Sequence, residues 1–307
     1  MTSAFAGDPA VAAPPWRRIE LPELGPIEVR DSGPLHGSGN GSADEPTILL
    51  LHGWTTSTDL NWCRTYEPLA RWRDGQIRIV TWDHRAHGAR GLRTGTTALI
   101  DDLADDTAAI AGALGIERAI VVGYSMGGAV AQATWRRHPD LVAGLVLGAT
   151  AARFGVGGRQ RKDFTLMDRG IGPARLLESV GCSALAWRAA RWFGDRHAGR
   201  AATDDASFDD WAWSETRSGV LSRVLAVGHD LGGFDATDWL CEVDVPHAVL
   251  VCNDDDIVPT VRQRELVDAL PAPFVYEMAT DHAACVLRPD LFIPALTAAL
   301  DEVTAAR

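Results

Sequence analysis

One pentapeptide constrains the fold of this chain more than any other feature. Residues 123–127, Gly-Tyr-Ser-Met-Gly, follow the apolar run 119–122 and lead into a helix-forming segment at 128–135. G-x-S-x-G between a strand and a helix is typical of a nucleophile elbow, a tight turn that exposes its serine. The flanking glycines let strand and helix approach without Cβ clashes, and a helix beginning at Met126 directs free N–H groups toward Ser125. By itself the motif does not distinguish a nucleophile from an ordinary glycine-rich turn.

The composition describes an ordinary globular protein. Of the 307 residues, 46% are hydrophobic and 23% charged, which is enough apolar material for one large domain or two small ones. The net charge of −12 argues against a nucleic-acid ligand, because phosphate binding needs a basic surface. No apolar run approaches the length of a membrane span, so no integral membrane segment is expected.

The N-terminus and the cysteines predict a cytoplasmic protein. Residues 1–15 have no basic segment ahead of their short Ala/Val stretch, and prolines and an aspartate interrupt it, unlike a secretory signal. The cysteines are odd in number and lack C-x-x-C spacing, which favours reduced, mostly buried thiols. None stands in a glycine-framed turn. They are Cys63, Cys182, Cys241, Cys252 and Cys285.

Apolar runs alternate with helical periods along the chain. This alternation predicts a parallel sheet covered by helices on both faces. The pattern also predicts an edge hairpin within residues 18–30. The expected strands span 47–51, 77–82, 119–123, 144–147, 247–251 and 274–278, and the expected flanking helices span 98–114 and 290–305.

The segment 153–240 differs from the rest of the chain in composition and in hydrophobic pattern. It lacks strand-like runs and is rich in Arg, Asp, Gly and Trp, which predicts a helical insertion that forms a cap or lid. The expected organisation is a flexible tail at 1–16, a core at 17–152 and 241–307, and the cap at 153–240. Two roles stay open for the tryptophans of this segment, which either line an acyl pocket or pack the cap onto the sheet.

Polar side chains follow the expected strands at the carboxyl edge of the sheet, where the active sites of such sheets form. Ser125 follows one strand, the aspartate run 254–256 follows another, and His282 follows the last. Their order, Ser…Asp…His, matches a known order of catalytic triads. Two further strands end at His52-Gly53-Trp54 and at Asp83-His84-Arg85.

These elements resemble the α/β-hydrolase superfamily, from roughly residue 45 to the end of the chain. The resemblance implies an α/β-hydrolase fold, with a mostly parallel central sheet, helices on both faces and a helical cap. It also implies hydrolysis by an activated serine. The matching residues are 50–54 (Leu-Leu-His-Gly-Trp), 83–88 (Asp-His-Arg-Ala-His-Gly), 123–128, the Asp255–Pro259 spacing of a D-x-x-x-P pattern, and His282.

The chemistry explains why these residue types are needed. Ser125 needs a base to take its proton, and His282 suits because an ordinary imidazole titrates near neutrality. A buried carboxylate, here Asp255, fixes the imidazole tautomer and stabilises the imidazolium. The developing oxyanion needs two donors, for which the backbone N–H groups of Met126 and Trp54 are expected.

Neighbouring residues compete for two of these roles. Gly228-His229 matches the family's Gly-His motif better than Asp281-His282 does. However, His229 precedes the strand that ends in the aspartates, so it is expected in the cap, and His282 is favoured as the base. Among the aspartates Asp256 is the alternative to Asp255, and a metal site there lacks further ligands. Asp281 is a departure from the family pattern, and either raises the pKa of the base or faces solvent.

The segment 83–88 is expected to organise a loop rather than to react. Its Asp83, Arg85 and His87 are assigned a structural role, as is His52, whose ring shapes the oxyanion loop. Family members usually carry glycine where Ala86 stands, so this turn is expected to differ slightly.

The sequence therefore predicts a serine hydrolase that cleaves a carboxylic ester or lactone with a hydrophobic part and needs no cofactor. The expected partner is a small-molecule substrate, and the oligomeric state is left open. The same triad serves thioester hydrolysis, C–C bond hydrolysis and acyl transfer. A serine nucleophile argues against a dehalogenase or an epoxide hydrolase, which require aspartate there. A non-catalytic binding protein is a second class, and a lipid-surface enzyme, disfavoured by the absence of a basic amphipathic stretch, is a third.

Overall fold

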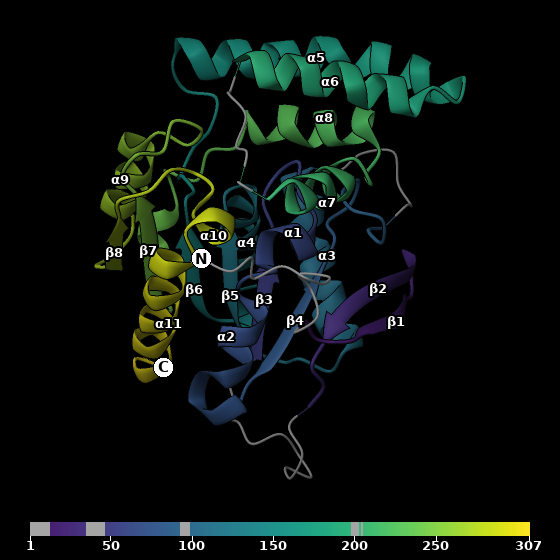
Figure 1. The fold of residues 1–307 in the computed structure, drawn as a ribbon. Coiled ribbons are helices and arrows are strands. Elements are labelled where there is room, and N and C mark those ends of the chain that lie inside the picture. The colour runs from purple at the N-terminus through teal and green to yellow at the C-terminus, as the bar shows by residue number, and fades with distance from the viewer. Residues whose placement is uncertain (1–12, 35–46, 93–98, 198–202, 204) are drawn as a thin grey trace.

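The computed structural model describes residues 13–34, 47–92, 99–197, 203 and 205–307. Its centre is an eight-stranded sheet with the order β1-β2-β4-β3-β5-β6-β7-β8 (Figure 1). β2 pairs antiparallel with β1 and with β4, and all other pairs are parallel. The strands are β1 Trp16–Leu21, β2 Gly25–Asp31, β3 Thr47–Leu51, β4 Arg78–Trp82, β5 Ala119–Tyr124, β6 Val142–Gly148, β7 His247–Cys252 and β8 Phe274–Met278.

Most of the predicted tail, residues 1–12, and most of the loop before β3 lie outside the described residues.

Helices connect and cover the strands. The α-helices are α1 Thr58–Trp62, α2 Tyr66–Arg71, α3 Ile100–Ala113, α4 Met126–Arg137, α5 Gly158–Ser179, α6 Ser183–His197, α7 Ala206–Thr216, α8 Leu221–Leu231, α9 Thr260–Ala269, α10 Ala284–Leu287 and α11 Pro289–Ala305.

The sequence-based strands and flanking helices are confirmed, with shifts of one or two residues at their ends. β3 illustrates why a continuous apolar run gives a strand here. Leu49 and Leu51 belong to the core on one face of the sheet, whereas Ile48 and Leu50 belong to the core on the other face. A strand buried on both sides has no polar face, so its sequence does not alternate.

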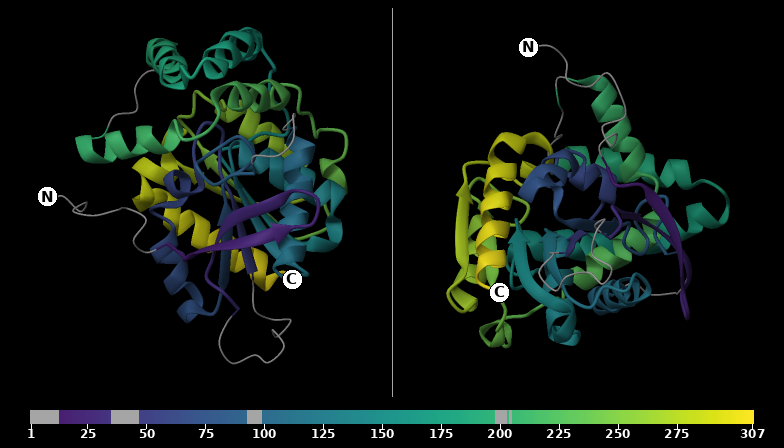
Figure 2. Two further views of the ribbon diagram at one scale, coloured as in Figure 1. Left: turned by 90° about the vertical axis from the view of Figure 1, so that its right-hand side faces the viewer. Right: turned by 90° about the horizontal axis from the view of Figure 1, so that it is seen from below.

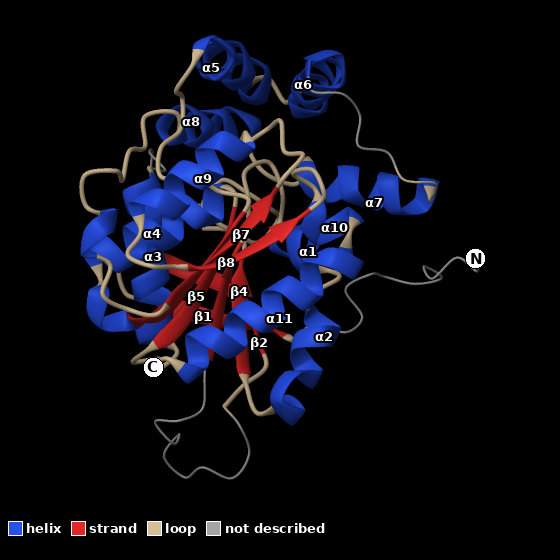
Figure 3. Cartoon of the chain, turned by 90° about the vertical axis from the view of Figure 1, so that its left-hand side faces the viewer, coloured by secondary structure: helices blue, strands red, loops and turns tan. Residues whose placement is uncertain are grey.

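Helices therefore lie in two layers around the sheet (Figure 3). α3, α4 and α9 contribute to one core, and α1, α2 and α11 contribute to the other. The prediction of a mostly parallel sheet with helices on both faces is confirmed. The predicted edge hairpin is also present, because β1 and β2 pair from Trp16–Arg30 to Leu21–Gly25.

Four helices, α5 to α8, lie between β6 and β7 in the sequence and on one side of the sheet in space (Figures 1 and 2). The carboxyl ends of the parallel strands point toward this side (Figure 3). α8 lies nearer the sheet, and α5 packs on α8 to form an outer layer together with α6. A bridge between Arg153 and Asp235 joins the two ends of the segment. In the described part of the chain, no helix combines the length and apolarity needed to cross a membrane.

A buried ion pair fixes α1 against β2. The guanidinium of Arg30 donates from Nε and Nη2 to the two carboxylate oxygens of Asp59, at 2.5 and 2.7 Å. Its Nη1 donates to the carbonyl of Pro14 at 2.6 Å, and both side chains are 10% exposed. Arg30 also lies 4.5 Å from the ring of Trp16. Because α1 follows the loop after β3, this pair holds the far end of that loop.

We predict that Asp59→Asn lowers the free energy of unfolding by about 3 kcal/mol, because it leaves the Arg30 charge buried without its partner. The matched control is Glu67→Gln, which breaks the exposed i,i+4 pair with Arg71 and should cost less than about 0.5 kcal/mol. Chemical denaturation of the two variants measures the difference. Equal costs would show that burial does not strengthen the Arg30–Asp59 pair.

Candidate active site

Ser125 stands at a sharp turn between β5 and α4. Its backbone has φ 55° and ψ −118°, a conformation that L-residues rarely adopt. A Cβ on Gly127 would lie 2.1 Å from the carbonyl oxygen of Leu51, and one on Gly123 would lie 2.2 Å from that of Gly127. Both glycines of the pentapeptide are therefore required by close backbone contacts, as the sequence predicts.

The structure brings together the three residues predicted to form the triad. His282, in the loop after β8, places its Nε2 2.9 Å from Oγ of Ser125 and its Nδ1 2.7 Å from Oδ2 of Asp255. Since the carboxylate only accepts, Nδ1 carries the proton, and Nε2 accepts from the Ser125 hydroxyl. The backbone carbonyl of His282 accepts a hydrogen bond from Tyr124 at 2.8 Å.

Asp255 is held by a set of donors of its own. Its Oδ1 accepts from the backbone N–H groups of Ile257 and Val258, both at 2.9 Å. Its Oδ2, which faces His282, also accepts from Nε2 of Gln263 at 2.9 Å. Gln263 in turn donates to the carbonyl of Val258 and accepts from the backbone of Cys252. The carboxylate is therefore fixed on both oxygens and has no access to solvent.

The competing residues lie elsewhere. Asp254 and Asp256 are exposed, whereas Asp255 is buried. His229 is exposed in the last turn of α8. Asp281 is also exposed, and its carboxylate accepts from the backbone N–H of Ala283 at 2.9 Å. Asp281 thus faces solvent, and it does not hold His282 away from Ser125.

The loop after β3 approaches the serine closely. A Cβ on Gly53 would lie 3.4 Å from Cβ of Ser125. The N–H of Gly53 donates to Oδ1 of Asn61 at 2.9 Å, and its carbonyl lies 2.7 Å from Nδ1 of His52. Because Nε2 of His52 accepts from the backbone N–H of His84, Nδ1 carries the proton and donates to Gly53. The peptide that joins Gly53 to Trp54 therefore has its carbonyl held and its N–H directed the opposite way.

His52, His84 and His87 form a buried cluster behind this loop. The ring of His52 lies 4.4 Å from that of His84 and 5.4 Å from that of His87. Burial lowers the pKa of His84 to about 3 and that of His87 to about 4, and it holds the pKa of His52 well below its usual range. Among the described residues, neither ring nitrogen of His84 has a hydrogen-bond partner. These imidazoles are neutral and support the loop, whereas His282 is partly exposed.

The other residues of the segment 83–88 bond to neighbouring loops and helices, in keeping with the structural role expected for them. Asp83 accepts from the backbone N–H groups of Thr58 and Arg90, and burial raises its pKa to about 6. Arg85 forms a two-fold ion pair with Asp106 at 2.5 and 2.7 Å. Ala86 has φ 72°, a left-handed conformation in which glycine is less strained. The turn therefore retains a backbone suited to glycine although it carries a Cβ.

The sequence does not single out the residues that hold the triad and the loop in place. Asn61 lies in α1 and Gln263 in α9, and an amide in an amphipathic helix carries no local signal of its partner. The cysteines are free and mostly buried, as expected, because only Cys182 and Cys241 are exposed. Burial raises the pKa of Cys63 and Cys252 to about 12, so these thiols are poor nucleophiles.

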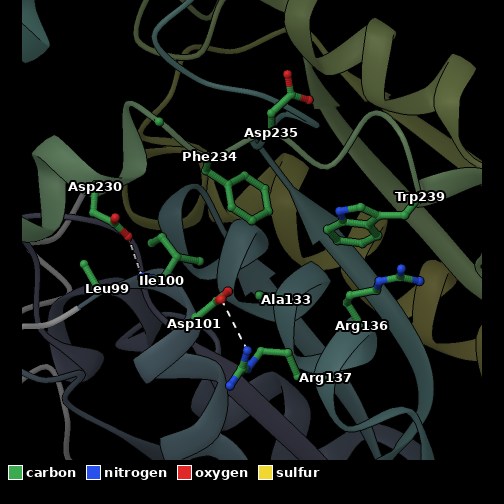
Figure 4. Close-up of a pocket in the computed structure, with 11 residues that line it drawn as sticks. Leu99, Ile100, Asp101, Ala133, Arg136, Arg137, Asp230, Phe234, Asp235 and Trp239 are labelled. Atoms are coloured by element: carbon green, nitrogen blue, oxygen red, sulfur yellow. Dashed lines mark hydrogen bonds and ion pairs between the residues drawn. The ribbon is translucent and has the colours of Figure 1, made fainter.

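A groove of about 410 Å³ lies on another part of the surface, between α3, α4 and the end of α8 (Figure 4). Arg136 and Arg137 line it, but each is already paired with an acidic side chain, Glu242 and Asp101 respectively. Asp230 accepts from the backbone N–H of Ile100. Ser125, Asp255 and His282 are not among its lining residues, so the groove is separate from the triad.

Comparisons with known proteins identify the family and agree with the fold. A family model described as "alpha/beta hydrolase fold" matches residues 46–169. A protein of Agrobacterium fabrum named "Putative carbamate hydrolase RutD" is 31% identical over 83% of this chain and 92% of its own length. The "Bifunctional esterase/perhydrolase DCH" of Acinetobacter calcoaceticus is 26% identical over 77% of this chain and 84% of its own length. A solved structure of a thermophilic esterase from Thermogutta terrifontis superposes with a TM-score of 0.71, at 22% identity, over 94% of this chain and 99% of its own.

We predict that the buried neutral His84 destabilises the protein in acid. Its pKa is lower in the folded than in the unfolded chain, so stability is full above about pH 6.5 and falls as the unfolded chain gains a proton below it. His84→Phe removes this one titration. The stability of the variant relative to the wild type should therefore rise by about 1.4 kcal/mol between pH 7.5 and 5.5.

Urea denaturation of both proteins at the two pH values measures this change. Asp83, whose pKa is raised, opposes the acid effect in both proteins and so cancels in the comparison. A relative stability that does not change with pH would show that the pKa of His84 is the same in the folded and in the unfolded chain.

Proposed function

Because the chain belongs to the α/β-hydrolase family, we propose that it is a serine hydrolase that cleaves a carboxylic ester or lactone. The observation that supports this most directly is the continuous contact from Ser125 through His282 to Asp255, with both hydrogen bonds under 3 Å. The tautomer of His282 and the burial of Asp255 support the roles proposed for them.

In the proposed first step, Oγ of Ser125 attacks the acyl carbon while Nε2 of His282 takes its proton. The carbonyl π electrons move to the oxygen and form a tetrahedral oxyanion. Asp255 stays ionised and stabilises the imidazolium through its bond to Nδ1. The fixed carboxylate oxygens prevent the ring of His282 from turning away.

The oxyanion is proposed to accept from two backbone donors. The N–H of Met126 is the first of α4 and has no acceptor within that helix. The N–H of Trp54 belongs to the peptide whose carbonyl His52 holds on the opposite side. Removing one such donor typically costs about 3 kcal/mol of transition-state stabilisation.

The intermediate then collapses, and the bond from the acyl carbon to the alkoxy oxygen breaks. His282 gives its proton to the leaving oxygen, which leaves an acyl-enzyme on Ser125. Water attacks this ester, with His282 as its base, and the carboxylic acid leaves as Ser125 regains its proton. All protons are transferred between the triad, water and the substrate.

The helices α5–α8 are proposed to act as a cap over this site, with the domain boundaries at 153 and 240. Trp187 is buried, lies edge-on to Trp213 with ring centroids 6.2 Å apart, and donates to the carbonyl of Gly219. These two tryptophans therefore pack within the cap, which favours the packing role over a pocket-lining role. Trp192 is 62% exposed. A hydrophobic part of the substrate is supported by the tryptophan-rich composition of this cap rather than by any one residue.

Carbamate hydrolysis is a second candidate, favoured by the relative named for that activity. A carbamate also presents an acyl carbon to Ser125, but its nitrogen lone pair makes that carbon less electrophilic. A p-nitrophenyl carbamate and a p-nitrophenyl ester of equal chain length share a leaving group. Their ratio of kcat/KM therefore measures the preference for one acyl group over the other.

We predict that a fluorophosphonate probe labels the wild-type protein once, at Ser125, and fails to label Ser125→Ala. Intact-mass spectrometry detects the adduct. Asp255→Asn should lower kcat for p-nitrophenyl butyrate about 10⁴-fold, because the amide stabilises the wrong imidazole tautomer.

Asp254→Asn and Asp256→Asn are matched controls, because these neighbours are exposed and should keep kcat within about two-fold. A folded wild-type protein that is neither labelled nor active on any acyl substrate would contradict the proposal and favour a ligand-binding role. Equal losses in all three aspartate variants would contradict the assignment of Asp255.

A further inference from the structure

The side chain of Trp54 is anchored far from its own loop. Its indole Nε1–H donates to the carbonyl of Val224 in α8 at 2.7 Å, across a separation of 170 residues. Trp54 is the residue whose backbone N–H is proposed to bind the oxyanion. The same residue thus contacts the reaction through its backbone and α8 through its side chain.

A glycine in α8 makes room for this indole. A Cβ on Gly228 would lie 2.6 Å from Cζ2 of Trp54, 2.7 Å from Cε2 and 3.0 Å from Nε1. These are ring atoms of a bulky side chain, so they cannot yield as the end of a flexible chain does. Glycine inside a helix costs about 1 kcal/mol relative to alanine, so its presence at this buried position calls for a packing reason. The indole supplies that reason.

α8 is itself fixed to the core around this contact. The backbone N–H of Val220, just before α8, donates to the carbonyl of Ala86 at 3.0 Å. At the other end of the helix, the carboxylate of Asp230 accepts from the backbone N–H of Ile100 at 2.7 Å. In the preceding α7, the carboxylate of Glu215 accepts from the hydroxyl of Ser57 at 2.5 Å. The helix that holds the indole is therefore tied to loops at the carboxyl edge of the sheet.

We propose that Gly228 and the carbonyl of Val224 form a seat for the indole of Trp54, and that this seat positions the oxyanion donor. His52 and Asn61 fix the peptide planes on either side of Gly53, and the seat fixes the next residue. Gly228 is thus a positioning residue that acts through Trp54, and the inference rests on the proposed hydrolase function. The innermost cap helix then contributes to transition-state binding as well as covering the site.

The test is a double-mutant cycle between Trp54 and Gly228. Gly228→Ala should lower kcat for p-nitrophenyl butyrate by 10- to 100-fold and change KM less than about three-fold, because a displaced donor weakens binding of the transition state. Trp54→Ala should lower kcat to a similar extent. In Trp54→Ala/Gly228→Ala the added methyl meets no indole, so it should cause no further loss, and the melting temperature should rise above that of Trp54→Ala.

Gly112→Ala is the matched control. Gly112 lies in α3, and a Cβ there meets no atom within 4 Å, so kcat should be unchanged. Wild-type kcat in Gly228→Ala would overturn the proposal. The proposal would also be overturned if Gly228→Ala lowered kcat as much in the Trp54→Ala protein as in the wild type. The effect of the added methyl group would then not pass through the indole.

Failure of the seat and failure of the proposed hydrolase function give different experimental results. Failure of the hydrolase assignment appears in the wild type, as absent labelling of Ser125 and absent turnover. The seat is still measured in that case, because the melting temperatures of the same four proteins report whether Trp54 and Gly228 are coupled. Additive shifts in melting temperature would refute the seat whatever the activity.

Discussion

The backbone conformation of Ser125 is the constraint on which the rest of the site depends. A non-glycine residue at φ 55° is strained, and it persists only because neighbouring contacts fix it. The carbonyl of Ser125 accepts from the N–H of Gly128 and from the hydroxyl of Thr150. Its own N–H donates to the carbonyl of Gly148. The turn is thus bonded to α4, to β6 and to the loop after β6, and any shift of the sheet moves the serine.

The machinery around the serine combines groups with opposite requirements. In the proposed mechanism His282 takes up and releases a proton, and 22% of its side chain is exposed. Deep burial is the main cause that lowers the pKa of His52, His84 and His87 and keeps these rings neutral, and neighbouring imidazoles lower the pKa of His52 and His84 further. The same side-chain type is therefore proposed as the base and also supports the loop, and the two positions differ in how much water each ring meets.

The sequence predicts what depends on local pattern. Ser125, Asp255 and His282 could be found because each follows a strand of a parallel sheet, and such strands end at a common edge. The strands could be found because burial on both faces leaves unbroken apolar runs. Gln263 and Gly228 could not be found, because their roles depend on partners 8 and 174 positions away that meet them only in the folded chain. Among the aspartates the sequence favoured Asp255, and only the fold shows that this carboxylate is buried and contacts Gln263.

The chain separation within the triad has a consequence for biosynthesis. Ser125 and His282 are 157 residues apart, so the contact closes only after His282 has left the ribosome. Such long-range contacts form late, because the entropy of closing the loop must be overcome first. A nascent or truncated chain would carry the elbow without its base. In the proposed mechanism, turnover would then report that this contact has formed, and a cell would be shielded from a prematurely reactive serine.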